Sequence, residues 1–475
     1  MCQSLVLAAV LALVPQGLAV FYRTEFLLMQ VDHFSHSSND TFPLRYLVND
    51  TYWDSNVGPI FFVTGGEETI EFFAENAGFV WEVAAIYKAM IVFAEHRYQG
   101  WSKPYGNYAF SSLRFLGYLT VEQTLKDFAN LIIHLRSSSS LLSNSPVITM
   151  GFGYSGALAA WMKVRYPHLV LGAVASSAPV VQQSTACNEF PRRVSAVFNA
   201  TSPACAAAIS RSWQAINRAA NYPRGRDWLS YNWRLCRPLY NPQEVYFLKS
   251  WLTAIYVYLA LYNYPYPDKV GNPLPANPVQ EACKALSSSN VQEDGDLLQA
   301  LFQTISVYSN TSGLAQCIDT HDIVLLEKAT LGANFLACSE LVTPLCSLGR
   351  DNDFFEAEPF NPTTYSNMCL ARWGVQPLFD YVAKTFGSIG AGSSSNIVFT
   401  NGLMDPYSSG SILYNVSSSV QAFNIPGGCH HMDFRFSHPE DPWPVVQARE
   451  FIKTHISKWL SSVSPIEPRR RRNEI

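Results

Sequence analysis

The sequence predicts an α/β fold in which a mostly parallel sheet carries a large helical insertion. Between residues 20 and 185, short apolar runs of strand length alternate with amphipathic stretches of helical period. Such alternation indicates parallel strands joined by helices. Residues 186–370 differ, because cysteines cluster there and aromatic helical patterns dominate. The α/β pattern returns over residues 371–464, so the middle region is interpreted as a mostly helical domain inserted over the sheet.

The individual strands and helices are assigned from hydrophobic periodicity. A helix is predicted over residues 121–135, where apolar side chains recur on one face, and another over residues 443–460, which close the fold. A third helix is predicted directly after residue 156. Buried strands are predicted at residues 59–63, 89–94, 147–150, 169–175, 397–400 and 420–425.

One strand–turn–helix junction has the form of a nucleophile elbow. The strand at residues 147–150 leads into G-F-G-Y-S-G, residues 151–156, and then into the predicted helix. An elbow usually follows the pattern G-x-S-x-G and holds its serine on a sharp turn between strand and helix. In this chain the position of that serine is occupied by Gly153.

Asp405 and His430 are the candidates for a catalytic acid and base. Each follows a predicted strand, so both fall at carboxyl ends of strands, where ligands bind in an open parallel sheet. A histidine base needs a carboxylate to fix its tautomer and to stabilise the imidazolium form. The order nucleophile, acid, histidine is that of the α/β-hydrolase fold. The sequence therefore predicts this fold with a base and its partner but without the usual hydroxyl.

Composition limits the class of protein. The 475 residues are 48% hydrophobic and 15% charged, which permits a sizeable core. A net charge of -4, with no basic stripe before the last residues, argues against nucleic-acid binding. No apolar stretch reaches the roughly 18 residues of a membrane span without a polar break. The basic tail at residues 465–475 is interpreted as a solvated chain end, with a cleavage or targeting signal as the alternative.

Several features together indicate the secretory pathway. Residues 1–19 carry no charged side chain and end in small residues, which predicts a signal peptide; a buried N-terminal strand is the alternative. Eight cysteines between Cys187 and Cys369 predict disulfides in the insertion, whose pairing the sequence leaves open, and Cys429 makes the count odd. We therefore expect a secreted or lysosomal glycoprotein, with N-x-S/T sequons at Asn39, Asn49, Asn199, Asn310 and Asn415.

Motifs spread over nearly the whole mature chain match one family. They include F-A-E-H-R-Y at residues 93–98, Y-P-H-L-V at 166–170, S-S-A-P-V at 176–180, Y-P-Y-P at 264–267 and S-H-P-E-D-P at 437–442. Through them the chain resembles the serine exopeptidases that cleave beside proline. That family includes lysosomal Pro-X carboxypeptidase, thymus-specific serine protease and dipeptidyl peptidase II, and the resemblance to the last is judged the strongest.

The resemblance implies roles for particular residues. Its elbow reads G-G-S-Y-x-G, which places the family's serine at Gly153, with His430 as the base and Asp405 as its partner. The backbone N–H of Tyr154 and the loop at Gly65 and Gly66 would form the oxyanion hole. No metal or organic cofactor is implied. Two segments depart from the family, residues 65–69, which read G-G-E-E-T instead of G-N-E-G-D, and residues 333–338, which replace W-x-Y-Q-A-C.

Three hypotheses follow from the glycine. In the first, the chain is a catalytically impaired homologue, because no acyl-enzyme forms without a nucleophile. In the second, the elbow register shifts and Ser155 is the nucleophile of an active dipeptidyl peptidase; Cys429 is a weaker candidate. In the third, the chain binds peptides with a small or proline second residue, or pairs as a homodimer or with an active relative.

Overall fold

The computed structural model describes residues 20–35, 38–268, 273–288, 291–311, 313–321, 331–389 and 394–463. The predicted signal peptide and basic tail lie outside these residues. Among the helices that are described, none combines the length and the apolar character that a bilayer crossing requires.

An eight-stranded sheet forms the centre of the fold. Its order is β1-β2-β4-β3-β5-β6-β7-β8, and the five pairings from β4 to β8 are parallel. The two pairings of β2, with β1 and with β4, are antiparallel. The strands are β1 Arg23–Gln30, β2 Thr41–Asn49, β3 Ile60–Thr64, β4 Met90–Ala94, β5 Val147–Phe152, β6 Gly172–Ser176, β7 Ile397–Gly402 and β8 Val420–Ile425.

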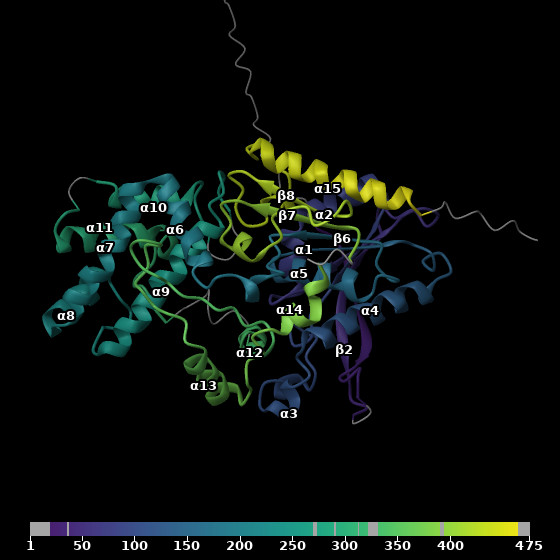
Figure 1. The fold of residues 1–475 in the computed structure, drawn as a ribbon, viewed down its shortest axis with the longest axis horizontal. Helices are drawn as coiled ribbons and strands as arrows, with labels where there is room; N and C mark the ends of the chain where they lie inside the picture. The colour runs from purple at the N-terminus through teal and green to yellow at the C-terminus, as the bar shows by residue number, and fades with distance from the viewer. Residues whose placement is uncertain are drawn as a thin grey trace, which may run out of the picture.

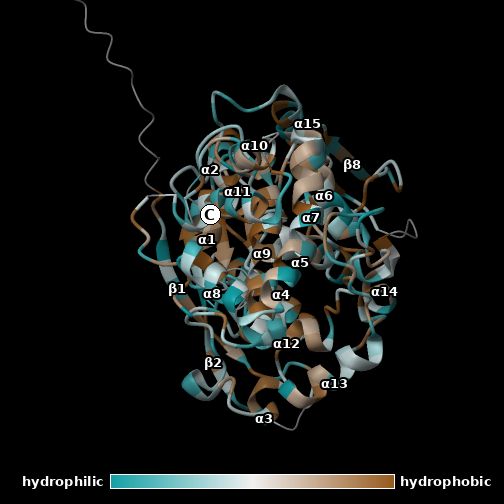
Figure 2. Cartoon of the chain, turned by 90° about the vertical axis from the view of Figure 1, so that its left-hand side faces the viewer, coloured by the Kyte–Doolittle hydropathy of each residue, from teal (hydrophilic) through white to brown (hydrophobic). Residues whose placement is uncertain are grey.

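Helices cover both faces of this sheet, which explains why the central strands are continuously apolar. Every residue of β3, β4, β5 and β6 is buried. Helices α4 Val121–Ser138 and α5 Gly153–Arg165 contribute to the hydrophobic core on one face. Helices α1 Ile70–Asn76, α2 Gly78–Tyr87 and α15 Trp443–Ser461 contribute to the core on the other face. The outer helix α15 carries both apolar and polar residues, as a helix that buries one face does (Figure 2).

The chain between β6 and β7 forms the inserted helical cap. Figure 1 shows helices α6 to α11 grouped beside the sheet, and they enclose a hydrophobic core of their own, which runs from Phe190 to Phe355. Two of these helices begin at Ser202 or Asn241, whose side chains accept a hydrogen bond from the first turn. The cap helices are α6 Glu189–Thr201, α7 Pro203–Ala220, α8 Pro223–Asn232, α9 Pro242–Leu261, α10 Pro278–Leu286 and α11 Asp294–Ser309.

The helices in the last part of the insertion pack against the core of the sheet rather than on the cap core. Phe335 and Leu336, on α12 Leu331–Ser339, belong to the core on the α4–α5 side. Helix α13 Pro362–Trp373 follows, and then α14 Tyr381–Phe386, whose Phe386 stacks on Trp161. The predicted disulfides are present, as Cys187–Cys346, Cys205–Cys283, Cys236–Cys317 and Cys338–Cys369. The fold is that of an α/β-hydrolase with a helical, disulfide-bearing insertion.

Candidate active site

The turn between β5 and α5 has the backbone of a nucleophile elbow. Gly153 begins the helix with a φ of 57°, in the left-handed region that side chains other than glycine adopt only with strain. The strand and helix also approach closely, since a Cβ atom on Gly151 would lie 2.3 Å from the hydroxyl oxygen of Ser155. The chain therefore forms the turn of an elbow. Glycine at position 153 avoids the strain of about 1–3 kcal/mol that another residue would have in this conformation.

The side chain missing from the elbow would point at His430. A Cβ atom built on Gly153 lies 3.7 Å from Nε2 of His430 and 3.8 Å from Cε1, and these are its contacts within 4 Å among the described residues outside its chain neighbours and the adjoining backbone of α5. A serine hydroxyl on that Cβ would extend into hydrogen-bonding range of the imidazole, as a nucleophile and its base require. The structure thus brings Gly153 and His430 together as the sequence predicts.

His430 is held as a base by Asp405. Nδ1 of His430 lies 2.9 Å from Oδ2 of Asp405, and the carboxylate is fully buried. The other carboxylate oxygen accepts the backbone N–H of Tyr407 at 2.9 Å. An ionised carboxylate only accepts, so Nδ1 carries the imidazole proton and Nε2 presents a lone pair toward Gly153. Asp405 caps the short helix that follows β7, which explains its fixed position.

The cap holds the histidine loop in place. The backbone N–H of His430 donates to the carbonyl of Leu261 at 3.1 Å, at the end of α9. The hydroxyl of Tyr264 donates to the carbonyl of His430 at 2.6 Å. Tyr407 packs its ring 5.1 Å from that of His430 and is covered by Phe190 of α6 at 5.2 Å. The insertion therefore fixes the base in place in addition to covering the sheet.

Ser155 makes different contacts. It is 1% exposed, its hydroxyl donates to the backbone carbonyl of Thr64, and the Thr64 hydroxyl donates to the Ser155 carbonyl at 2.7 Å. These bonds fasten the first turn of α5 to the end of β3. The Ser155 hydroxyl is thus used in strand–helix packing.

Cys429 is a buried free cysteine beside the base. Its thiol donates to the carbonyl of Asn263 at 3.2 Å. Burial raises the pKa of the Cys429 thiol to about 12, and the charge of Asp405 acts in the same direction. Because the thiolate is the nucleophilic form, this environment disfavours a catalytic role.

The expected oxyanion donors lie at the start of α5. Tyr154 is the second residue of the helix, so its N–H is among the first helical amides, which have no acceptor within the helix. Gly66 approaches the same turn, because a Cβ on it would lie 3.4 Å from the backbone nitrogen of Ser155. The N–H of Gly65 instead donates to the carbonyl of Ala94 at 2.8 Å, so Gly65 fixes the loop against β4.

Two carboxyl groups near the elbow were not assigned a role from the sequence. Burial raises the pKa of Glu67 to about 7, and burial likewise raises the pKa of Glu340 to about 7. Their charges add to the effect of burial in raising the pKa of the Tyr154 phenol well above its usual value. Glu67 lies in the loop at residues 65–69, whereas Glu340 directly follows α12, and only its packing reveals its place.

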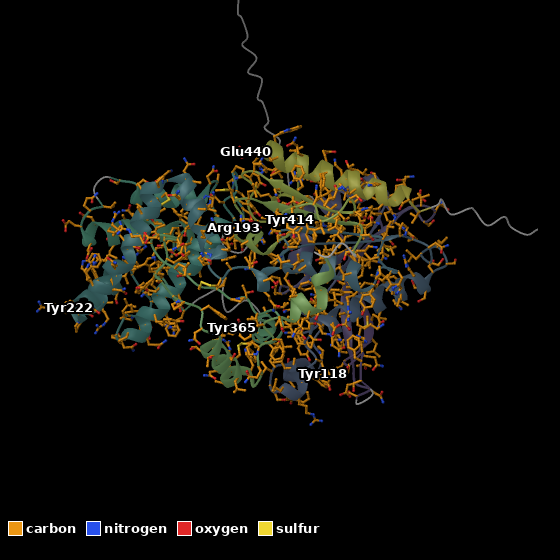
Figure 3. All side chains as sticks on the ribbon, viewed as in Figure 1. Tyr118, Arg193, Tyr222, Tyr365, Tyr414 and Glu440 are labelled. Atoms are coloured by element: carbon orange, nitrogen blue, oxygen red, sulfur yellow. A yellow bond between two sulfur atoms is a disulfide. The ribbon has the colours of Figure 1, made fainter. Side chains whose placement is uncertain are left out.

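His431 and Arg193 are two further groups that sequence reasoning missed. Burial, with the charge of His430, lowers the pKa of His431 well below its usual range, and its ring lies 4.3 Å from that of Phe152. Arg193, on α6, lies where the cap meets the sheet (Figure 3), and burial lowers its pKa while Asp405 opposes that shift. His431 is recognisable in the sequence only as the neighbour of His430, and Arg193 carries no sequence signal.

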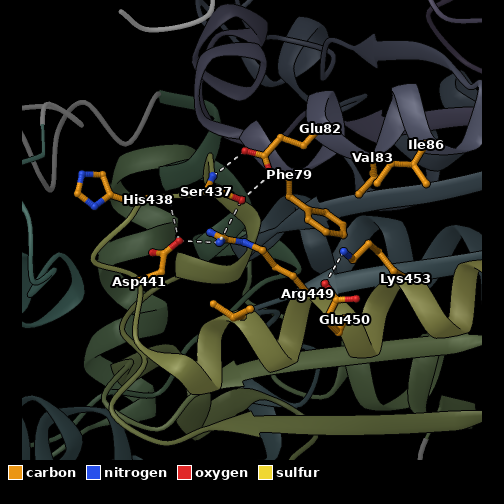
Figure 4. Close-up of a pocket in the computed structure, with 11 residues that line it drawn as sticks. Phe79, Glu82, Val83, Ile86, Ser437, His438, Asp441, Arg449, Glu450 and Lys453 are labelled. Atoms are coloured by element: carbon orange, nitrogen blue, oxygen red, sulfur yellow. Dashed lines mark hydrogen bonds and ion pairs between the residues drawn. The ribbon is translucent and has the colours of Figure 1, made fainter. Parts of the chain in front are cut away.

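A separate pocket lies between α2 and α15 (Figure 4). Its volume is 260 Å³, and none of Gly153, Asp405 or His430 lines it. Within it Arg449 pairs with Asp441 at 2.6 Å and Lys453 pairs with Glu450, whereas Glu82 accepts hydrogen bonds from Ser437. Among the described residues there is no cluster of three or more His, Cys, Asp or Glu side chains that could hold a metal.

The five sequon asparagines all lie among the described residues. Asn39, Asn199 and Asn415 are exposed, whereas Asn49 and Asn310 are half-buried. The side-chain amide of Asn49 donates to the carbonyl of Phe21 at 2.8 Å and to the hydroxyl of Thr51 at 3.0 Å, so glycosylation there would remove one of these two bonds.

Comparison with known proteins identifies relatives along almost the whole chain. A family model described as "Serine carboxypeptidase S28" matches residues 29–452. Lysosomal Pro-X carboxypeptidase of Homo sapiens is 41% identical over 441 residues, which cover 92% of this chain and 88% of that protein. Thymus-specific serine protease of Mus musculus is 27% identical and covers 91% of this chain and 86% of that protein. Among solved structures, the peroxisomal α/β-hydrolase Lpx1 of Saccharomyces cerevisiae matches 95% of this chain and 92% of its own, with 10% identity and a TM-score of 0.42.

Proposed function

Because the chain belongs to the serine carboxypeptidase S28 family, we propose that it is a peptide-binding member in which acyl-enzyme formation is blocked at position 153. One observation carries the proposal. The Cβ position of Gly153 faces Nε2 of His430 at 3.7 Å, so the elbow has the place for a serine but no hydroxyl in it. Serine proteases that lose one member of the triad lose on the order of 10⁶ in turnover.

The remaining groups keep the roles that binding requires. Asp405 orients His430, and the N–H of Tyr154, together with the loop at Gly66, receives the carbonyl oxygen of a bound peptide. The alternative with Ser155 as nucleophile is less well supported, because the hydroxyl of Ser155 is bonded to Thr64.

The ligand class follows from the relatives. The name Pro-X carboxypeptidase describes a protein that acts beside proline. We propose that this chain binds peptides in which proline, or a small residue, precedes the bond that lies over Gly153. Gly66, in the segment at residues 65–69, approaches Ser155, and Phe335 and Leu336, in the segment at residues 333–338, share a core with Tyr154. Differences in these segments would therefore change which neighbouring side chains are accepted.

The compartment is proposed on the same basis. Relatives are named lysosomal, and four disulfides require oxidising conditions. We propose a vesicular, lysosomal or extracellular lumen, with glycans on the exposed sequons Asn39, Asn199 and Asn415.

The test is to measure binding and turnover on the same protein. Fluorescent peptides containing proline would be titrated against the full chain, with matched peptides carrying the bulky residue phenylalanine in place of proline. We expect saturable, proline-dependent binding, no cleavage of the peptide and no covalent labelling by a fluorophosphonate. Cleavage that Ser155→Ala abolishes, or equal binding of both peptides, would overturn the proposal.

A further inference from the structure

The site holds a histidine that is oriented by a carboxylate and whose ring faces the side-chain position of Gly153. Nδ1 of His430 is fixed by Asp405 at 2.9 Å, and the second oxygen of Asp405 is held by the N–H of Tyr407. Beyond residues 152–154 and the neighbouring backbone of α5, the atoms of the described residues within 4 Å of the Cβ position of Gly153 are those of the His430 ring. The lone pair on Nε2 is therefore directed at the space where a serine side chain would lie.

This space suits a water molecule. The CH₂OH group that glycine lacks occupies about the volume of one water, about 30 Å³ in the liquid. Unlike a serine hydroxyl, a water there is not covalently attached to the chain. It would donate a hydrogen bond to Nε2 of His430 from the position of the serine hydroxyl. It also lies beside the N–H groups that begin α5, which are oriented to receive a carbonyl oxygen.

We infer that this site hydrolyses small activated esters directly, with a water molecule as nucleophile and His430 as general base. The water oxygen bonds to the ester carbonyl carbon while its proton moves to Nε2 of His430. The carbonyl oxygen becomes an oxyanion held by the N–H of Tyr154. When the tetrahedral intermediate collapses, the C–O bond to the leaving group breaks, and the proton on His430 passes to the alcohol or phenol. The products are a free carboxylic acid and an alcohol or phenol, and no acyl-enzyme forms.

The same geometry limits the substrates. A peptide bond needs an amine to be expelled and protonated, and a free water is a weaker, less well-positioned nucleophile than a serine held on the elbow. An aryl ester has a stable phenolate as its leaving group, so its hydrolysis needs little more than attack of the water on the carbonyl carbon. General-base catalysis contributes about 10²–10⁴-fold. The activity is therefore expected with short aryl esters and not with peptides.

The experiment is the hydrolysis of p-nitrophenyl acetate by the full chain and by four variants. We expect a wild-type rate that is linear from the start, with no burst. His430→Gln is expected to lose about 10²-fold. Gly153→Ala is expected to lose at least about tenfold, because its methyl group occupies the water's place and leaves His430 intact. His168→Ala, at an exposed histidine, is the control for nonspecific hydrolysis and should leave the rate unchanged. Gly153→Ser should convert the time course to a burst followed by slow turnover.

Melting temperatures of all variants would show that they are folded. Equal rates in the wild type and His430→Gln, or a burst in the wild type, would overturn the inference. The inferred ester hydrolysis rests on the proposed function only because both use the same oxyanion donors. Either one can be wrong while the other holds. Proline peptides that bind while the ester is not hydrolysed would overturn the hydrolysis alone. Ester hydrolysis that proline peptides do not inhibit would count against the proposed peptide site alone.

Discussion

The two halves of the candidate site differ in what they retain. On the histidine side, Asp405 and His430 are hydrogen-bonded to each other, and the cap adds two hydrogen bonds to the histidine backbone. On the elbow side, the backbone keeps its left-handed turn at Gly153 but has no reactive side chain. The elbow's shape is required by the packing of α5 on the sheet, whereas its hydroxyl is required only by chemistry. A glycine at position 153 therefore keeps the packing of α5 and lowers the strain of the turn.

The electrostatic settings of the two halves differ as well. Asp405 is buried but has a hydrogen-bond donor on each oxygen, so its charge is compensated. Near the elbow, burial raises the pKa of Glu67 and of Glu340 to about 7, so these carboxyls favour the neutral form in acid. The histidine side thus contains a buried carboxylate with a hydrogen-bond donor on each oxygen, whereas the carboxyls of Glu67 and Glu340 on the elbow side become charged only as the pH rises.

The largest effect is expected from restoring the hydroxyl. Gly153→Ser should place a serine oxygen in hydrogen-bonding range of Nε2 of His430. Peptide hydrolysis should rise by at least about 10³-fold, below the roughly 10⁶-fold value of a full triad member because the flanking segments differ from the family. Hydrolysis of proline-containing reporter peptides, with either a free N-terminus or a free C-terminus, measures this, and fluorophosphonate labelling identifies the serine.

Gly153→Ala is the matched control for that experiment, since it adds the same strain and the same Cβ without the hydroxyl. Its peptide hydrolysis should stay at the wild-type level. If Gly153→Ser instead folds and binds peptide but neither cleaves the peptide nor reacts with the fluorophosphonate, then Asp405 and His430 do not activate a serine. In that case the difference drawn between the two halves of the site is wrong.

A smaller effect is expected at Ser155, and it is one of stability. Ser155→Ala removes the hydroxyl that bonds the Thr64 carbonyl and leaves buried polar groups with fewer partners. The free energy of unfolding should fall by about 1–3 kcal/mol, measured by chemical denaturation. In the Gly153→Ser background, cleavage should persist. Ser143→Ala, at an exposed serine, should change stability by less than about 0.5 kcal/mol. Loss of cleavage without loss of stability would make Ser155 the nucleophile.

The sequence predicts the elements whose pattern is local. The helix predicted at residues 121–135 is α4 Val121–Ser138, and the one at 443–460 is α15 Trp443–Ser461. All six predicted strands are present, although the one expected at 169–175 begins only at Gly172. The elbow and the positions of Asp405 and His430 at strand ends could be predicted because each follows a continuous apolar run.

Long-range contacts could not be predicted in the same way. The antiparallel strands β1 and β2 were not predicted, because most of β1 is exposed and lacks a strict alternation. Glu340 reaches the backbone of Val121 across 219 positions in the chain, and no local pattern records that contact. Gly65 was predicted to help form the oxyanion hole, yet its N–H is bonded to β4, since sheet pairing decides which amide of the loop remains for a ligand.

The smallest expected effect tests the electrostatic difference at the elbow side. Glu340 accepts the N–H of Val121 at 2.8 Å, and burial raises its pKa from 4.5 to about 7. The folded state therefore binds this proton more tightly than the unfolded chain does. The resulting stabilisation is complete below pH 4.5 and is lost as the pH rises through about 7. In Glu340→Gln, the amide oxygen still accepts the bond but does not ionise. The fall in unfolding free energy between pH 5 and pH 8 should shrink by on the order of 1 kcal/mol.

His96, whose pKa burial lowers to about 4, acts with the opposite sign and is common to both proteins. Glu358→Gln, at an exposed carboxyl, should follow the wild-type profile. If Glu340→Gln follows it too, then Glu340 is ionised in the fold and the elbow side is as charged as the histidine side.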